Sequence, residues 1–153
     1  MKRISLLMLF FTGFTRFSAD IQKSTKLTLE EKRNQLDSML SLVDEAQDIL
    51  ENNERDLDDF GRLLDKTWKL KRQTGNQVST GSIDELYEKG IAAGALGGKL
   101  LGAGGGGFLL FYVIKENQDR VREALKDLME VPFKFENSGA RVIYYTPESY
   151  EKR

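Results

Sequence analysis

The sequence predicts an α+β domain, a ferredoxin-like antiparallel sheet with helices packed on one face and a helical insertion. A short apolar run at residues 4–11 and a continuously apolar run at 108–114 predict buried strands. Between them lie segments with apolar residues at helical spacing, and a further helix and strands are expected after the second run. A length of 153 residues with 40% hydrophobic content suits one core, so residues 1–153 are assigned to a single domain.

The N-terminal run, from Ile4 to Phe11, is interpreted as a buried strand. It follows Lys2 and Arg3, and a basic start before an apolar run also resembles the front of a signal peptide. Export through such a start is the weaker alternative. The run is far shorter than the ~20 apolar residues that a bilayer requires. We therefore expect a cytoplasmic protein that does not associate with membranes.

Helical spacing dominates residues 28–94. Thr28 and Glu31 form a capping box that predicts a helix over about 28–51. A second amphipathic segment follows, and its Trp68 is expected in the core or at a domain interface. Ser82 and Glu85 form a second capping box, which predicts a third helix toward Gly94.

The C-terminal part is predicted to complete the sheet. The run Phe108–Ile114 is rich in aromatic residues and is expected to be a strand buried on both faces. Asn117 is a candidate cap for a helix that carries Val121 and Leu125. Alternation at 133–136, a turn, and a β-branched and aromatic run at 141–145 predict a closing pair of strands.

The composition excludes several kinds of chemistry. The chain has no cysteine and no histidine, so disulfides, thiolate or imidazole metal sites and histidine-dependent nucleophiles are ruled out. The net charge of −1 gives no electrostatic basis for binding nucleic acid. Phosphoryl transfer is still open, because it relies on positioning and electrostatics. We predict no catalytic residue and no metal site in this chain.

A cluster of glycines is the most unusual feature of the sequence. Most of the fourteen glycines lie between Gly90 and Gly107. Such a run is tolerated where positive φ angles or a close backbone approach require it. Gly102, Gly104 and Gly107 match the spacing of a dinucleotide-binding loop, but that motif needs a helix to follow, and a predicted strand follows here.

The sequence does not match a Walker A loop either. Gly98-Lys99 is followed by Leu100, and Ala93 occupies the first glycine position. Two interpretations stay open from spacing alone. The glycines form either a loop between two strands whose amides line an anion site or pack against another phosphate loop, or a bulged hairpin that only turns the chain. A basic cluster at a predicted helix end, Lys69, Lys71 and Arg72, is assigned no partner.

The stretch from Gly97 to Phe111, GGKLLGAGGGGFLLF, resembles the third, C-terminal motif of the GHMP kinases. That family is named for galactokinase, homoserine kinase, mevalonate kinase and phosphomevalonate kinase. Leu9–Arg16 and Ile83–Tyr87 are similar to the heptose-phosphate kinase branch and its sugar-kinase relatives. The three stretches occur in the expected order over most of the chain.

The resemblance implies phosphoryl transfer from ATP·Mg²⁺ to a hydroxyl of a small molecule, here a sugar or sugar phosphate. It implies a loop near the transferred phosphate that consists of Gly102, Ala103, Gly104, Gly105, Gly106 and Gly107. Thr12, Gly13 and Arg16 become candidates to line the sugar pocket. The Arg16 guanidinium suits a substrate phosphate, although a surface arginine is an equally good interpretation.

The chain also departs from the family pattern. Leu101 stands where many members have Ser or Thr, and the Gly-Leu-Gly-Ser-Ser phosphate motif is absent. We therefore expect the chain to be inactive alone, to bind neither ATP nor Mg²⁺ tightly, and to need an N-terminal kinase domain as partner. Self-association through the exposed domain interface is also expected. The alternative is a stand-alone ferredoxin-like module that binds a ligand or partner without catalysis, which a genuine start at Met1 would favour.

Overall fold

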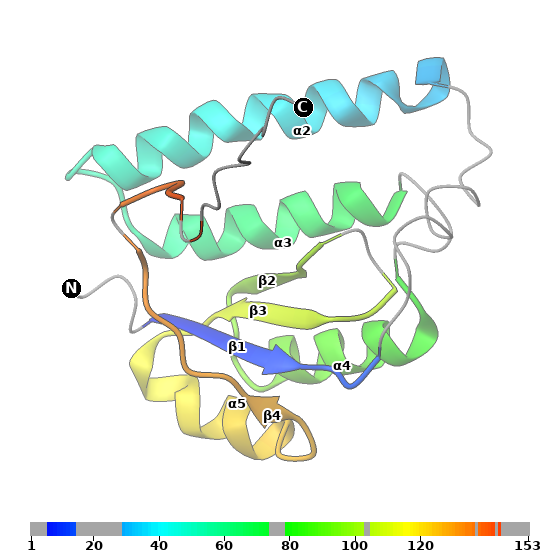
Figure 1. The fold of residues 1–153 in the computed structure, drawn as a ribbon, viewed down its shortest axis with the longest axis vertical. Helices are drawn as coiled ribbons and strands as arrows, with labels where there is room; N and C mark the ends of the chain where they lie inside the picture. The colour runs from blue at the N-terminus through cyan, green and yellow to red at the C-terminus, as the bar shows by residue number, and fades with distance from the viewer. Residues whose placement is uncertain are drawn as a thin grey trace, which may run out of the picture.

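The fold is an antiparallel sheet between helical layers (Figure 1). A computed structural model describes residues 6–14, 29–73, 79–102, 105–136, 138–142 and 144. The helices are α2 (Leu29–Glu51), α3 (Asp58–Gln73), α4 (Gly81–Ala92) and α5 (Gln118–Ala124), with a short 3-10 helix η2 (Lys115–Asn117). The strands are β1 (Leu7–Phe11), β2 (Gly97–Leu100), β3 (Phe108–Tyr112) and β4 (Met129–Glu130).

The sheet confirms the ferredoxin-like prediction. Its order is β2-β3-β1-β4, and all neighbouring strands are antiparallel. The first strand of the chain is therefore central, with Leu7 opposite Tyr112 and Phe11 opposite Phe108. Figure 1 shows α2 lying over α3, α3 lying along β2, and α4 and α5 on the other side of the sheet.

The main core lies between the sheet and helices α4 and α5. Directly opposed residues of an antiparallel pair share a face, so Phe10 and Leu109 point to the same side. The core cluster contains Met8, Phe10, Trp68, Ile83, Tyr87, Ala95, Leu100, Leu109, Phe111, Val113, Val121 and Leu125. The expectation that Trp68 is a core residue is confirmed, because its side chain is fully buried and its ring lies 6.1 Å from that of Tyr87.

Helix α3 approaches the opposite face of the sheet through glycine. A Cβ on Gly97 of β2 would overlap the carbonyl oxygen of Gly61, and a Cβ on Gly61 would lie 2.7 Å from the Tyr112 ring. Backbone contact between helix and strand is possible only because both positions lack a side chain. Helix α2 packs on α3 through a smaller apolar cluster that includes Leu42, Ile49 and Leu63.

Three sequence predictions need correction. The Ser82–Glu85 capping box is wrong, because Thr80 is the N-cap of α4 and its hydroxyl accepts the Ile83 N–H at 3.4 Å. Asn117 occupies the N-cap position of α5 as predicted, but its side chain makes no capping hydrogen bond. It donates instead to the Gly94 carbonyl at 3.1 Å.

The third correction concerns the predicted closing strands at 133–136 and 141–145. The described residues of both segments have no strand, and the short β4 directly after α5 completes the sheet beside β1. Strand β3 is buried as expected at Leu109, Phe111 and Tyr112, but its first residue, Phe108, is 37% exposed. The predicted cap at Thr28 lies outside the described residues.

Candidate glycine-loop site

The loop between β2 and β3, residues 101–107 and here called the glycine loop, has a backbone that only glycine adopts readily. Gly102, Gly105 and Gly107 have φ values of +84°, +73° and +104°, in the left-handed region that other residues avoid. The loop closes with the Leu101 N–H donating to the Phe108 carbonyl at 2.8 Å. Ala103 and Gly104 lie outside the described residues.

The segment that follows β1 is bonded to this loop. Both the backbone N–H and the hydroxyl of Thr12 donate to the Gly107 carbonyl, each at 2.9 Å. The Gly107 N–H donates in turn to the Phe14 carbonyl at 2.8 Å. A side chain on Gly106 would overlap that same carbonyl, so this position is glycine because another backbone segment passes close to it.

The structure thus places the predicted sugar-pocket residues Thr12 and Gly13 beside the glycine loop. Thr12 is 5% exposed, and its hydroxyl also accepts the Phe14 N–H at 3.3 Å, so this hydroxyl braces the loop. Gly13 makes the turn between them, with φ of +75°. Arg16, the third candidate for the sugar pocket, lies outside the described residues.

Helix α3 contributes a residue that the sequence analysis did not assign. The Lys71 ammonium donates to the Gly102 carbonyl at 2.5 Å. Burial lowers the pKa of Lys71, and the nearby charge of Lys99 on β2 lowers this pKa further. The sequence signal was a basic residue in the last turn of a helix, which is an equally good place for a cation without function.

Aromatic side chains flank the glycine loop. Phe14 is 42% exposed and Phe108 is 37% exposed, and the Phe108 ring lies 5.2 Å from that of Phe11. Apolar surface therefore borders the loop. Self-association through this surface stays a prediction.

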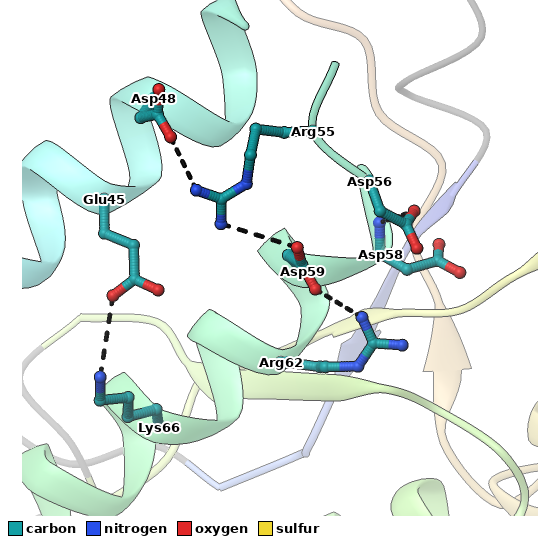
Figure 2. A network of polar contacts seen from close by, with 8 residues as sticks. All are labelled: Glu45, Asp48, Arg55, Asp56, Asp58, Asp59, Arg62 and Lys66. Atoms are coloured by element: carbon teal, nitrogen blue, oxygen red, sulfur yellow. Dashed lines mark hydrogen bonds and ion pairs between the residues drawn. The ribbon is translucent and has the colours of Figure 1, made fainter. Parts of the chain in front are cut away.

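A network of ion pairs joins α2 to α3 away from the glycine loop (Figure 2). The pairs are Asp48–Arg55 at 2.7 Å, Arg55–Asp59 at 3.6 Å, Asp59–Arg62 at 2.6 Å and Glu45–Lys66 at 3.7 Å. The opposite charges neutralise one another, and the side chains are between a third and two thirds exposed. Such pairs contribute modestly to stability and offer no reactive group.

Two buried tyrosines link α3 to the rest of the domain. The Tyr87 hydroxyl donates to Asp65 at 2.8 Å, and the Tyr112 hydroxyl donates to Asp58 at 3.1 Å. Burial, followed by the bonded carboxylate, raises the pKa of both phenols. Both groups therefore stay neutral near pH 7 and act as structural hydrogen-bond donors.

The described residues supply no metal centre and no membrane span. Within the described ranges, no group of three or more acidic side chains lies close enough together to hold a metal ion. No described helix combines the length and apolar character that a bilayer crossing requires.

An apolar cavity of about 390 Å³ lies between α3 and β3 and contains no reactive group. It is lined by Leu7, Leu50, Leu57, Phe60, Leu64, Leu110, Tyr112 and Phe135.

Comparison with known proteins identifies the family. The family model for the C-terminal domain of GHMP kinases matches residues 39–131, which is more than half of the chain. The chain belongs to the GHMP kinases. The family expected from the sequence is thereby confirmed.

The relatives of this GHMP domain include enzymes with different substrates. It is 31% identical over 120 residues to D-glycero-α-D-manno-heptose 7-phosphate kinase of Campylobacter jejuni, covering 78% of this chain and 35% of that protein. It is 34% identical over 110 residues to mevalonate kinase of Thermococcus onnurineus, covering 69% of this chain and 32% of that protein. The chain therefore spans about a third of the length of these relatives.

A solved structure supports the fold. The mevalonate kinase of Methanococcus jannaschii matches with a TM-score of 0.68 at 24% identity, over 82% of this chain and 38% of that one. At this level of identity the match establishes a shared fold, and substrate specificity must be argued from the site.

Proposed function

We propose that this chain supplies the C-terminal part of an ATP-dependent kinase that phosphorylates a sugar or a sugar phosphate, with a heptose phosphate as the first substrate to test. The observation that carries the proposal is the bonding of the Thr12–Phe14 segment to the glycine loop. It joins the two segments that the family resemblance assigns to substrate and to phosphate. The relative from Campylobacter jejuni, a heptose 7-phosphate kinase, supports the choice of substrate.

In this proposal the chain positions reactants and does not react with them. The glycine loop closes one side of the active site and places backbone amides near the transferred phosphate. Gly13 and Arg16 border the sugar pocket, and the Thr12 hydroxyl holds the loop in place. The rest of a GHMP kinase would supply the catalytic group, the nucleotide loop and the site for Mg²⁺. Because ATP is the phosphoryl donor, we place the enzyme in the cytoplasm.

A chimeric kinase tests this role. The C-terminal third of the Campylobacter jejuni heptose 7-phosphate kinase is replaced by this chain, and ATP-dependent phosphorylation is measured with heptose 7-phosphate, fucose and mevalonate. We expect turnover of the heptose phosphate by the chimera and none by this chain alone. Turnover of mevalonate in preference to both sugars would show that the substrate class is wrong. Robust turnover by the isolated chain would show that the chain is not a partial enzyme.

Matched glycine variants control for folding of the chimera. Gly105→Ala places a side chain at a buried position with φ of +73°, so the loop must change shape and activity should fall strongly. Gly81→Ala adds a methyl group at the start of α4, where nothing lies within 4 Å, and should leave activity unchanged. Equal activity of the two variants would argue against a role for the loop in catalysis.

One observation is equally compatible with the non-catalytic alternative. Each described glycine of the loop has a local reason to be glycine, either a positive φ or the close approach of Phe14. A binding module without catalysis would need the same residues. If the chimera folds and phosphorylates none of the three substrates while the isolated chain binds a ligand, the module becomes the better explanation.

A further inference from the structure

Helix α2 carries two apolar stripes, and only one of them faces α3. Leu42 and Ile49 belong to the cluster that packs on α3. The second stripe lies about a third of a turn away around the helix. Its residues follow one another at spacings of four and three, and we call them the outer stripe: Leu36, Leu40, Val43, Gln47 and Leu50. One apolar stripe is enough to pack a surface helix on its own domain, so the outer stripe is not needed for the contact with α3.

The outer stripe is open to solvent over most of its length. Leu36, Leu40 and Val43 are 46%, 69% and 57% exposed. Helical residues three and four apart are neighbours, so these side chains form one patch. The ion pairs of Figure 2 do not cover it, because Glu45 and Asp48 lie on the other flank of the α2–α3 contact. Exposed apolar patches of this kind mark sites of interaction.

The outer stripe ends at a cavity. Leu50, its last residue, lines the apolar cavity of about 390 Å³ together with Phe60 and Leu110. Among the described lining residues, the one polar side-chain group is the Tyr112 hydroxyl, which is bonded to Asp58. Protein interiors are close-packed, and an apolar cavity stays dry. A large apolar side chain of a partner would fill it, as anchor residues fill pockets at interface hot spots.

Acidic residues follow one edge of the outer stripe at intervals of seven. Asp37, Asp44 and Glu51 each come directly after a stripe residue, and all three are exposed. The seven-residue interval places them on the same edge of the helix. Arg33 on this side pairs with Asp37 at 3.8 Å. A second copy of the chain would bring the same acidic edge, whereas a basic edge would complement it.

We propose that the outer stripe of α2 binds a basic amphipathic helix from outside this chain. The partner helix has apolar residues at spacings of three and four, basic residues along one edge, and a large apolar side chain at the end that reaches the cavity. Helices that dock in apolar grooves use anchors at this spacing. The stripe is about 21 Å long from Leu36 to Leu50, so a helix of about 15 residues covers it.

Two designed peptides of this length test the chemistry of the partner. Both carry leucine at spacings of three and four and tryptophan at both ends, and the flanking positions hold lysine in one peptide and glutamate in the other. Binding to the isolated chain is measured by NMR through the backbone amides of residues 36–50. We expect saturable shifts with the lysine peptide, at least about tenfold tighter binding than with the glutamate peptide, and a smaller difference in 1 M NaCl. Equal affinities would overturn the proposed partner.

Paired variants test the surface. Leu40→Gln should weaken binding of the lysine peptide about tenfold. Met129→Gln changes a similarly exposed apolar residue on β4 and should bind as the wild type does. Leu64→Phe fills part of the cavity, so it should weaken binding of the tryptophan peptide and leave binding of a peptide with alanine at both ends unchanged.

Two results with these variants would overturn the site. One is equal affinity of folded Leu40→Gln and Met129→Gln for the lysine peptide. The other is a dimer of the wild-type chain in sedimentation equilibrium that Leu40→Gln dissociates, since the stripe would then belong to a second copy. Neither result depends on phosphoryl transfer, so the proposed function stands or falls separately.

Discussion

Replacing Thr12 by valine removes the hydroxyl that ties the end of β1 to the glycine loop and keeps the shape of the side chain. The hydroxyl donates to Gly107 at 2.9 Å and accepts from Phe14 at 3.3 Å. A buried hydrogen bond contributes about 0.5–1.5 kcal/mol net. The Gly107 carbonyl still accepts the Thr12 N–H, and Phe14 is 42% exposed, so water can reach its N–H. We therefore expect a loss of about 1–2 kcal/mol, below the upper end for an unsatisfied buried group.

Urea unfolding followed by the fluorescence of Trp68 measures this loss, since Trp68 is the single tryptophan and is fully buried. If the loss is local, hydrogen exchange of the Gly107 amide should accelerate about five- to thirtyfold. Thr12→Ser is the matched control, because it retains the hydroxyl and should leave this exchange nearly unchanged. Wild-type stability together with wild-type exchange in the valine variant would refute the assignment of Thr12 as the brace of the loop.

Three further predictions test contacts between α3 and the rest of the domain. Gly97→Ala places a methyl group against the Gly61 carbonyl and should lower the free energy of unfolding by about 3 kcal/mol or more, because the two backbones must separate. A loss below about 1 kcal/mol in urea unfolding would contradict this contact. The pKa of Tyr87 is raised in the native state by burial and its aspartate partner. An unfolded tyrosine ionises near pH 10, so stability should fall as the pH rises above about 10, and less steeply in Tyr87→Phe; equal slopes would argue against a buried neutral phenol. Arg55→Met removes two partly exposed ion pairs and should cost about 1 kcal/mol or less, and the loss should shrink in 1 M NaCl. A loss that persists in salt would point to packing instead.

The elements that the sequence predicts well are those with a local physical signature. The apolar runs of β1 and β3 have the length and composition of buried strands, and helices α2 and α3 follow the 3.6-residue period. Local signatures fail where two residues can perform the same task. Thr80 and Ser82 are both good N-caps, and the sequence favoured Ser82 because Glu85 follows it at capping-box spacing.

Alternation also misleads when no partner strand is available. Residues 133–136 alternate in polarity as an edge strand would, but β4 at Met129–Glu130 already occupies the free edge of β1. A strand requires a neighbour, and the local pattern carries no information about the neighbour.

Some features of the candidate site could likewise be predicted from the sequence, and others could not. The five glycines among residues 102–107 predict an unusual backbone, and the structure has positive φ there at three described residues. The contact between Thr12 and Gly107 spans 95 residues of sequence, and the family resemblance, not spacing, suggested that the two segments belong together. Lys71 had no such signal, because its contact with Gly102 depends on how α3 lies against β2.

The central place of β1 has a practical consequence for how this domain is delimited. The family model matches residues 39–131, whereas β1 ends at Phe11 and lies between β3 and β4. A protein cut at the limits of the family match would lose the middle strand of its sheet and expose two unpaired edges, which invite aggregation. The same topology delays folding, because Leu7 must wait for Tyr112, more than a hundred residues further along the chain, before the sheet can form.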